Sequence, residues 1–188
     1  MNFLETKLKE TYETLNPEHI KHGHEWYENA HKLIKIYSDD LRVKPEEFAA
    51  VTSILSPFNP WERNIDDASK LIFAVKYEPE QLDKLTFTTF KNNVRKAIGY
   101  IKGEVMLEYS GANKTYSFAK NLLLDPDYVT IDSHMLKFVD MKQTFGVKTL
   151  TERAYSEYSE ALKKVSKGYF LHGYQLQASL WLHARENL

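Results

Sequence analysis

The chain has 188 residues, of which 43% are hydrophobic and 27% are charged, and its formal net charge is -1. These values are typical of a soluble globular domain, and no apolar run approaches the ~20 residues that a membrane-spanning helix needs. Because the sequence has no cysteine, it excludes disulfide bonds, thiolate metal sites and a cysteine-ligated iron–sulfur cluster, and it favours a cytoplasmic protein.

Three proline-containing segments mark the first predicted helices. Asn16-Pro17-Glu18 combines an N-cap residue, a proline at the first helical position and a first-turn acid, which predicts a helix to about Ser38. Pro45 begins a second helix, which Ser56-Pro57 ends. Asn59-Pro60-Trp61 repeats the first pattern and begins a third helix.

The remaining apolar periodicity is also helical, and the sequence therefore predicts an all-α fold. Further helices are expected at about 88–102, 114–124, 133–139, 150–166 and 172–187. Only residues 127–131 suggest an extended conformation, and one short segment forms no sheet. We expect one helical domain with two lobes, residues 1–58 with 141–188 and residues 59–140, and a site at the mouth between them.

Lys114 and Asp132 are the strongest catalytic candidates. Lys114 opens a predicted helix after a small-residue turn, and Asp132 follows 18 residues later in Val129-Thr130-Ile131-Asp132. An amine and a carboxylate suit covalent chemistry at a sugar anomeric carbon, where the amine attacks and the carboxylate manages charge and protons. The alternative is structural: Lys114 is then a surface lysine, and Asp132 is the N-cap of the helix at 133–139, where Asp and Asn are nearly equivalent.

The order of several motifs resembles that in the helix-hairpin-helix DNA glycosylase superfamily, over about residues 46–140. Asn113-Lys114-Thr115 and Val129-Thr130-Ile131-Asp132-Ser133-His134 match the family's hairpin lysine and its V-D-T-H-type segment. Residues 48–57, followed by Trp61 and Asn64, look like the helix and L-S-x-Q turn that such enzymes place against DNA, and residues 92–97 resemble their N-x-x-K-A helix start. The resemblance implies a two-lobed helical enzyme without a cofactor, in which Lys114 is the nucleophile and Asp132 its electrostatic and acid/base partner.

Two positions depart from the family pattern. The hairpin has one glycine, Gly111, where the family usually shows two, which affects the expected backbone contact with a DNA phosphate. Pro57-Phe58 replaces the glutamine of the turn after Ser56, so contact with the strand opposite the target base is expected to differ.

A second resemblance spans nearly the whole chain. Leu55-Ser56-Pro57, Lys114 to Phe118, Val129 to Asp132, and Gln177-Ala178 with Trp181 are similar to small bacteriophage proteins. These lie near the alpha-glutamyl/putrescinyl thymine pyrophosphorylase-like enzymes associated with hypermodified phage DNA. The alternative function that this implies is a transferase that builds onto a base and leaves it on its sugar.

Seven further residues are candidates for contacts with DNA or with the base. They lie in the family-like turns, beside Asp132, or on the C-terminal helix, and are Ser56, Trp61, Asn64, Gly111, Asn113, His134 and Gln177. Trp61 suits stacking on an extruded base, or the core at a helix start. For Asn64 the alternative is a hydrogen bond in the first helical turn, and for His134 a bond to backbone. Gln177 either reads a base edge or ties two helices together.

DNA is the expected partner, and a local basic surface must supply the affinity because the net charge is near zero. The candidate residues are Lys91, Arg95, Lys96, Lys102, Lys114, Lys120 and Lys137. A solvated helix face is the alternative interpretation.

His24, Glu28 and His31 share one helical face, but such a row is more often solvated, and no metal is expected. A monomer is favoured, and a DNA-binding module without catalysis remains a further alternative for the whole chain.

Overall fold

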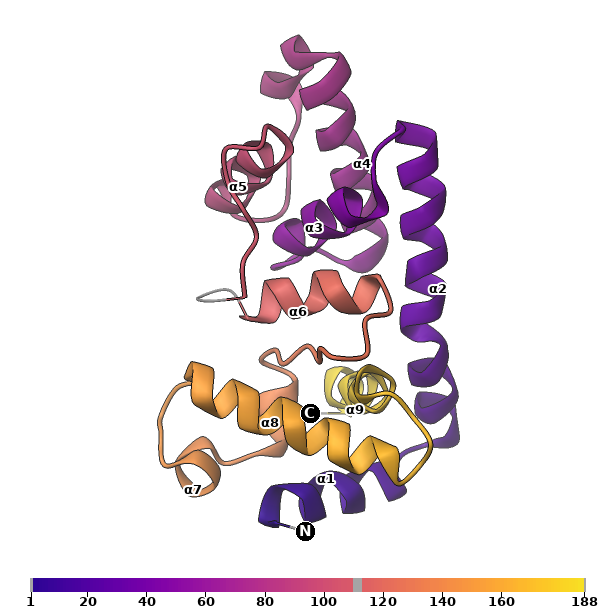
Figure 1. Cartoon of the computed structure of the whole chain (residues 1–188), viewed down its shortest axis with the longest axis vertical. Helices are drawn as coiled ribbons and strands as arrows, with labels where there is room; N and C mark the ends of the chain where they lie inside the picture. The colour runs from indigo at the N-terminus through magenta and orange to yellow at the C-terminus, as the bar shows by residue number, and fades with distance from the viewer. Residues whose placement is uncertain (1, 110–112, 188) are drawn as a thin grey trace. The chain divides into compact units, whose positions relative to one another are not determined.

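The computed structural model describes residues 2–109 and 113–187, and within these ranges the fold is all-α, as the sequence predicts (Figure 1). The helices are α1 (Phe3–Glu13), α2 (Pro17–Leu41), α3 (Pro45–Leu55), α4 (Trp61–Tyr77), α5 (Lys91–Ile101), α6 (Asn113–Leu122), α7 (Met141–Phe145), α8 (Glu152–Lys167) and α9 (Gly173–Asn187), with 3-10 helices η1 (Pro79–Lys84) and η2 (Met135–Phe138). None of the described helices is long and apolar enough to cross a membrane.

The chain divides into two compact units. Unit 1 comprises Met1–Ala30 and Lys120–Leu188, and unit 2 comprises His31–Ala119. These bounds differ from the lobes expected from the sequence, which change at 58/59 and 140/141. The reason is packing: α3 packs on α4 and α5 in unit 2, whereas η2 packs on α9 in unit 1.

Unit 1 has an apolar core between α1, α8, α9 and the segment that follows α6. Its fully buried members include Leu8, Tyr158, Leu162 and Leu176. Gly23 of α2 faces Ser179 of α9 so closely that a Cβ atom at position 23 would collide with the serine backbone. Glycine normally weakens a helix interior, and here it permits the close crossing of the two helices.

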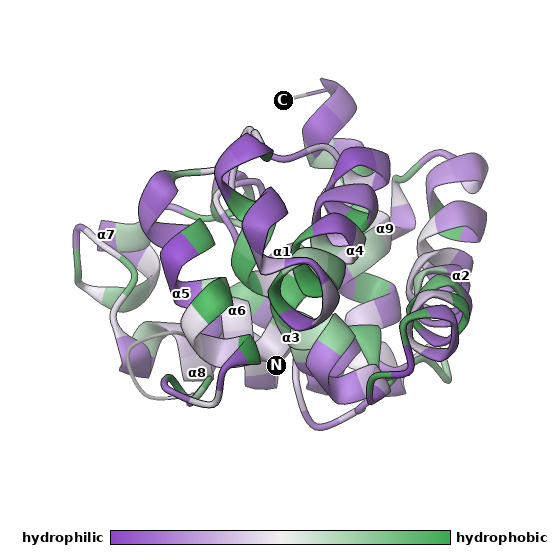
Figure 2. Cartoon of the chain, turned by 90° about the horizontal axis from the view of Figure 1, so that it is seen from above, coloured by the Kyte–Doolittle hydropathy of each residue, from purple (hydrophilic) through white to green (hydrophobic). Residues whose placement is uncertain are grey.

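Unit 2 is centred on α3, whose residues are buried from Phe48 to Leu55. The helix packs against α4 and α5, and Phe48 stacks on Tyr37 of α2 at a ring-centroid distance of 5.6 Å. Figure 2 shows that α5 carries both hydrophilic and hydrophobic residues, as expected for a helix with one buried side.

Candidate functional site

Asp132 lies on an extended segment of unit 1 and is held by three N–H donors. Its Oδ1 atom accepts the backbone N–H groups of His134 at 2.9 Å and Met135 at 3.1 Å. Its Oδ2 atom accepts the indole N–H of Trp181 at 2.9 Å. The carboxylate therefore caps the turn that leads into η2 and joins it to α9, which fixes the orientation of its oxygens.

The segment before Asp132 has no strand partner among the described residues, so side chains satisfy its backbone. The hydroxyl of Tyr155 accepts the N–H of Ile131 at 3.0 Å and donates to the carbonyl of Val129 at 3.0 Å. Asn121 donates through Nδ2 to the carbonyl of Tyr128 at 2.7 Å. Because unpaired buried backbone groups are costly, these side chains determine the path of the segment and hence the position of Asp132.

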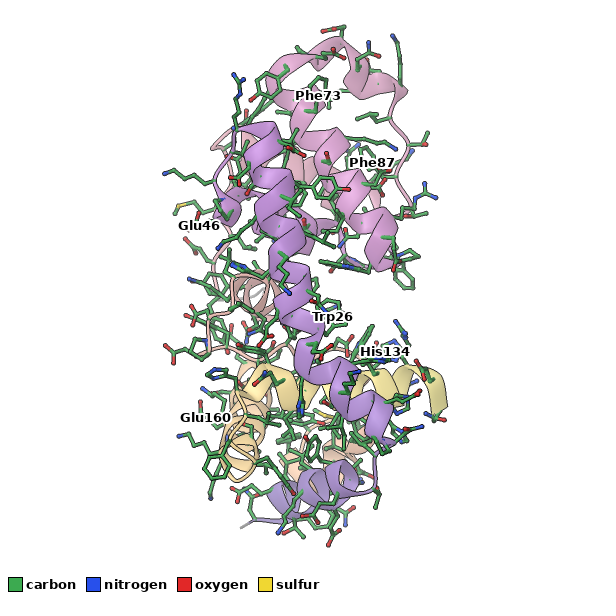
Figure 3. The ribbon with its side chains drawn as sticks, turned by 90° about the vertical axis from the view of Figure 1, so that its right-hand side faces the viewer. Trp26, Glu46, Phe73, Phe87, His134 and Glu160 are labelled. Carbon is green, nitrogen blue, oxygen red and sulfur yellow. The ribbon has the colours of Figure 1, made fainter. Side chains whose placement is uncertain are left out.

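Trp181 is the centre of an aromatic cluster beside the carboxylate, which we call the Trp181 cluster (Trp26, His134, Trp181 and Arg185). The ring of His134 meets Trp181 edge-on at 5.8 Å, and that of Trp26 lies at 6.3 Å. The Arg185 guanidinium lies 4.9 Å from the Trp181 ring centroid. In Figure 3 the labelled Trp26 and His134 lie near each other alongside α9. Trp26, His134 and Trp181 are half-buried, so the cluster is open in part to solvent.

Beneath this cluster, buried polar side chains pair with one another. The Tyr27 hydroxyl donates to Oε1 of Gln177 at 3.1 Å, and Thr130 donates to Oδ1 of Asn121 at 2.8 Å. Burial raises the pKa of Tyr27, and the charge of the nearby Asp132 raises it further, so its proton stays in place at neutral pH. Gln177 thus ties α9 to α2, which is the structural role among its two interpretations.

Lys114 is half-buried at the second position of α6 in unit 2. Two neighbours on this helix have buried oxygens without a hydrogen-bond partner among the described residues: Oδ1 of Asn113 and Oγ of Ser117. Asn113 and Ser117 lie four positions apart and share one face of α6. Buried polar atoms in folded proteins are normally satisfied, so this unsatisfied pair is unusual, and both atoms are closed to solvent in the described structure.

The remaining family-like residues of unit 2 build the turn between α3 and α4. Asn64 is 1% exposed and donates through Nδ2 to the carbonyl of Thr52 at 2.9 Å. Its hydrogen bonds therefore join α4 to α3. Trp61 begins α4 and meets the ring of Phe118 at 6.5 Å, and Ser56 is the C-cap of α3.

The pairing of Lys114 with Asp132 stays a prediction, because the two residues belong to different units and each unit is described by itself. Gly111 lies outside the described residues. In the described part of the chain, no group of three or more His, Cys, Asp and Glu residues is arranged to hold a metal ion. His24, considered above for such a site, shares a hydrogen bond of 2.7 Å with the Tyr12 hydroxyl.

The basic candidates differ in their surroundings. Lys91 and Arg95 of α5 are exposed. Lys120, in contrast, pairs with Asp125 at 3.6 Å and lies over the Tyr128 ring. Lys137 donates to the carbonyl of Ala184 at 3.2 Å. The exposed cations of α5 are therefore more available for phosphate contacts than these two.

Several residues of the site were not found by sequence reasoning. Arg185 lies four residues after Trp181 on the same helix, a spacing that could have predicted their contact. Trp26 of α2 contacts Trp181 from a helix far away in the chain, and Tyr155 binds a segment that precedes it by more than 20 residues. Such pairings leave no local signal. Asn121 did leave one, because a buried asparagine at the end of a helix, just before an extended segment, is well placed to bond that segment's backbone.

Comparison with protein families places the whole chain in one of them. A model for a family of unknown function, DUF7178, matches residues 3–188. The chain belongs to this family. The match spans both units, so the Asp132 and Lys114 regions are both part of the family's domain. No curated protein and no solved structure matches the chain.

Proposed function

We propose that this protein is a DNA glycosylase-like enzyme that acts on a damaged or modified base taken out of the DNA stack. The observation that carries the proposal is the Asp132 carboxylate, fixed by three N–H donors beside the half-buried Trp181 cluster. The resemblance of the motifs around Lys114 and Asp132 to those of glycosylases supports the same conclusion.

The hydrogen bonds of Asp132 leave part of its acceptor capacity for a substrate. A carboxylate offers about four acceptor sites, two on each oxygen. Within the described residues Oδ1 receives two donors and Oδ2 receives one, so Oδ2 keeps one acceptor site. A negative oxygen at a fixed position stabilises positive charge that builds on a sugar as its glycosidic bond breaks, because it needs no rearrangement at that moment.

The Trp181 cluster supplies flat surfaces next to that oxygen. An enzyme that acts on a base in DNA must take the base out of the stack and then hold it between aromatic or apolar side chains. Trp181 and Trp26 are suited to this, and Arg185 adds a planar cation that also stacks on bases.

Lys114 provides the amine in this proposal. Its attack on C1′ of the sugar displaces the base, and opening of the sugar ring leaves an imine between the lysine and the sugar. Lys114 is half-buried, so its side chain is open in part to solvent and available for such a reaction.

A DNA-binding module without catalysis is the second candidate. The hydrogen bonds of Asp132 favour this candidate, because they already give the residue a structural role: it caps a turn and anchors that turn to α9. A carboxylate in that role needs no substrate to explain its presence.

Borohydride trapping tests the proposal with oligonucleotides that carry damaged and phage-type modified bases. We expect a reduced covalent complex and release of free base with the wild type. The complex should disappear in Lys114→Ala and base release should disappear in Asp132→Asn. Exposed Lys44 and the α7 cap Asp140 give matched controls, Lys44→Ala and Asp140→Asn, which should behave as the wild type.

Two other outcomes contradict the glycosylase proposal. An altered base that stays attached to its sugar identifies the transferase alternative. Binding without trapping, base release or base alteration over the whole panel identifies the module without catalysis.

A further inference from the structure

Two exposed phenylalanines of unit 2 form a pair on the surface. Phe58, between α3 and α4, is 80% exposed, and Phe90, directly before α5, is 57% exposed. Their rings meet edge-on with centroids 5.2 Å apart. Most of the area of both rings therefore faces solvent, although each ring contacts the other.

The backbone at Phe58 is unfavourable for a phenylalanine. Its φ angle is +57°, in the left-handed region that favours Gly or Asn and that bulky residues rarely adopt. The ring gains little burial in return, because it is mostly exposed. Phe170 of unit 1 has the same backbone conformation and is 99% exposed, so these two costs alone do not identify a binding site. Phe58 is distinguished by the second exposed ring beside it and by the cations that follow Phe90.

A polar network holds the two turns together. Thr88, two residues before Phe90, donates to Oδ1 of Asn59 at 2.8 Å. Asn59 in turn donates through Nδ2 to Asp67 of α4 at 2.9 Å. Asn59 follows Phe58 directly, so these bonds hold together the two turns that carry the rings. The pair is a built feature of the surface, and the rings do not depend on each other alone for their placement.

The helix that follows Phe90 carries only positive charge. Its charged residues are Lys91, Arg95 and Lys96, no acidic residue lies between Lys91 and Ile101, and no side chain caps its N-terminus. Phe90 is the N-cap at the positive end of the α5 dipole, exposed Lys91 follows it directly, and exposed Arg95 lies one helical turn after Lys91 on the same face. Of the acids on α4, Asp66 pairs with Lys70, and Asp67 with Arg63, while Glu62 is exposed.

We propose that Phe58 and Phe90, with Lys91 and Arg95, form a binding surface for single-stranded nucleic acid. A single strand combines a chain of phosphates with base faces that are free to stack, which matches cations beside exposed rings. A duplex fits less well, because its bases are already stacked and separating them costs a few kcal/mol per step. The inference rests on the proposed function for its choice of nucleic acid as the substrate, and it adds where the strand beside the target base is held.

Fluorescence anisotropy with a labelled 20-nucleotide oligo(dT) tests this surface on the full chain. This probe carries no modified base, so binding is measured apart from chemistry. Phe58→Asn removes the ring and keeps a residue that tolerates positive φ, and Phe90→Ala removes the second ring. Each change should weaken binding about 5-fold or more, as expected for the loss of one ring that stacks on a base.

The chain offers a matched control for Phe58. Phe170, in the turn after α8 of unit 1, is 99% exposed and has a φ angle of +58°. Phe170→Asn therefore removes an equally exposed ring from the same backbone conformation, and binding should not change. Thermal melts followed by circular dichroism establish that all three variants are folded.

Replacing both cations tests the electrostatic part. In Lys91→Gln/Arg95→Gln, the slope of log K against log salt should become less steep by about 1.4, since each phosphate contact on a single strand contributes about 0.7.

The inference is overturned if the protein does not bind oligo(dT) at low salt, or if Phe58→Asn and Phe170→Asn weaken binding equally. It is also overturned if duplex DNA binds with the same dependence on Phe58 and Phe90 as the single strand. The fourth contrary result is self-association of the protein that is lost in Phe58→Asn. The last result identifies the pair as a contact between copies of this chain. Ring-dependent binding without trapping on the modified-base panel upholds the surface and refutes the enzyme, so the two failures are distinguishable.

Discussion

Replacing Asp132 with Asn separates the catalytic and structural roles of this residue, but not in the way that the sequence suggests. At an ordinary N-cap, Asp and Asn are nearly equivalent. In the structure, however, Oδ2 of Asp132 also accepts the Trp181 indole N–H at 2.9 Å. An asparagine that keeps the cap with its carbonyl oxygen turns its NH2 group toward the indole N–H, so that two donors face each other.

The cost follows from the bond that is lost. A hydrogen bond to a charged group contributes about 1.5–3 kcal/mol, and the lower end applies because Asp132 and Trp181 are both half-buried. We expect Asp132→Asn to lower the free energy of unfolding by about 1.5 kcal/mol. For a chain of this length that corresponds to a decrease of about 3–6 °C in Tm. Asp140→Asn is the control, since it caps α7 through one exposed bond to the Gln143 N–H and should change stability by less than about 0.5 kcal/mol.

A double-mutant cycle identifies the indole bond as the cause. Trp181→Phe keeps a ring and removes the N–H donor, so the donor conflict is absent in Asp132→Asn/Trp181→Phe. Unfolding in urea, followed by circular dichroism, should give a double variant about 1.5 kcal/mol more stable than the sum of the single effects predicts. Base release should stay absent in the double variant, because stability is regained without the carboxylate. Additivity within about 0.5 kcal/mol, or an Asp132→Asn protein as stable as the wild type, would refute the reasoning.

Three further predictions concern the framework around the site. Tyr155→Phe should lower the free energy of unfolding by about 2–4 kcal/mol, because it leaves a buried N–H and a buried carbonyl unpaired; a cost below about 1 kcal/mol in urea unfolding argues against the described clamp. Phe170→Gly should raise Tm by about 2–4 °C, since glycine removes the cost of positive φ, about 1 kcal/mol, and the ring is exposed; an unchanged Tm contradicts this. Lys164, by its hydrogen bond, holds the pKa of Glu5 below its usual 4.5, so this pair stabilises the fold above that pH and its contribution is lost as the pH falls through the lowered pKa. In Lys164→Gln, the Tm should therefore fall less between pH 7 and pH 3 than in the wild type, and parallel Tm curves would exclude this linkage.

Local chemistry predicted the starts of three helices to within one residue. The proline signals place the starts of α2 and α3 at Pro17 and Pro45, and the structure confirms both. For α4 they predict Asn59 as the N-cap and Pro60 as the first residue, whereas in the structure Pro60 is the N-cap and the helix begins one residue later, at Trp61. These signals work because N-caps and first-turn prolines act over one turn of chain. The same kind of signal was present for α1, where Asn2 and Glu5 form a capping box, and could have been found.

The helix expected at 133–139 shows where local information ends. The structure has a 3-10 helix of four residues there, Met135–Phe138, so that expectation was wrong in type and length. Tyr158 donates to the carbonyl of Met135 at 2.7 Å, and Asp132 takes two N–H groups of the turn. A tertiary contact from α8 thus competes with the i to i+4 bonding that a longer helix needs.

In the candidate site, too, contacts between residues near each other in the chain were predictable, and contacts between distant residues were not. The cap made by Asp132 lies within three residues of it and was readable from the sequence. Its bond to Trp181 joins residues 49 positions apart, and the bond between Tyr27 and Gln177 joins residues 150 apart. Without an alignment of homologues, nothing in a single sequence pairs such positions.

Spare hydrogen-bonding capacity separates the residues that can act on a substrate from those that hold the fold. Asn64 is 1% exposed and donates its side-chain N–H to the carbonyl of Thr52, and Gln177 is 3% exposed and accepts from Tyr27, so both side chains are buried in contacts between helices. Asp132 keeps one acceptor site within the described residues and is half-buried, and Lys114 is half-buried as well. A ligand gains most where the protein has left a polar atom unpaired, because binding then removes an existing cost. The chemistry is therefore to be sought at Asp132 and at Lys114, whereas Asn64 of α4 and Gln177 of α9 hold their helices in place.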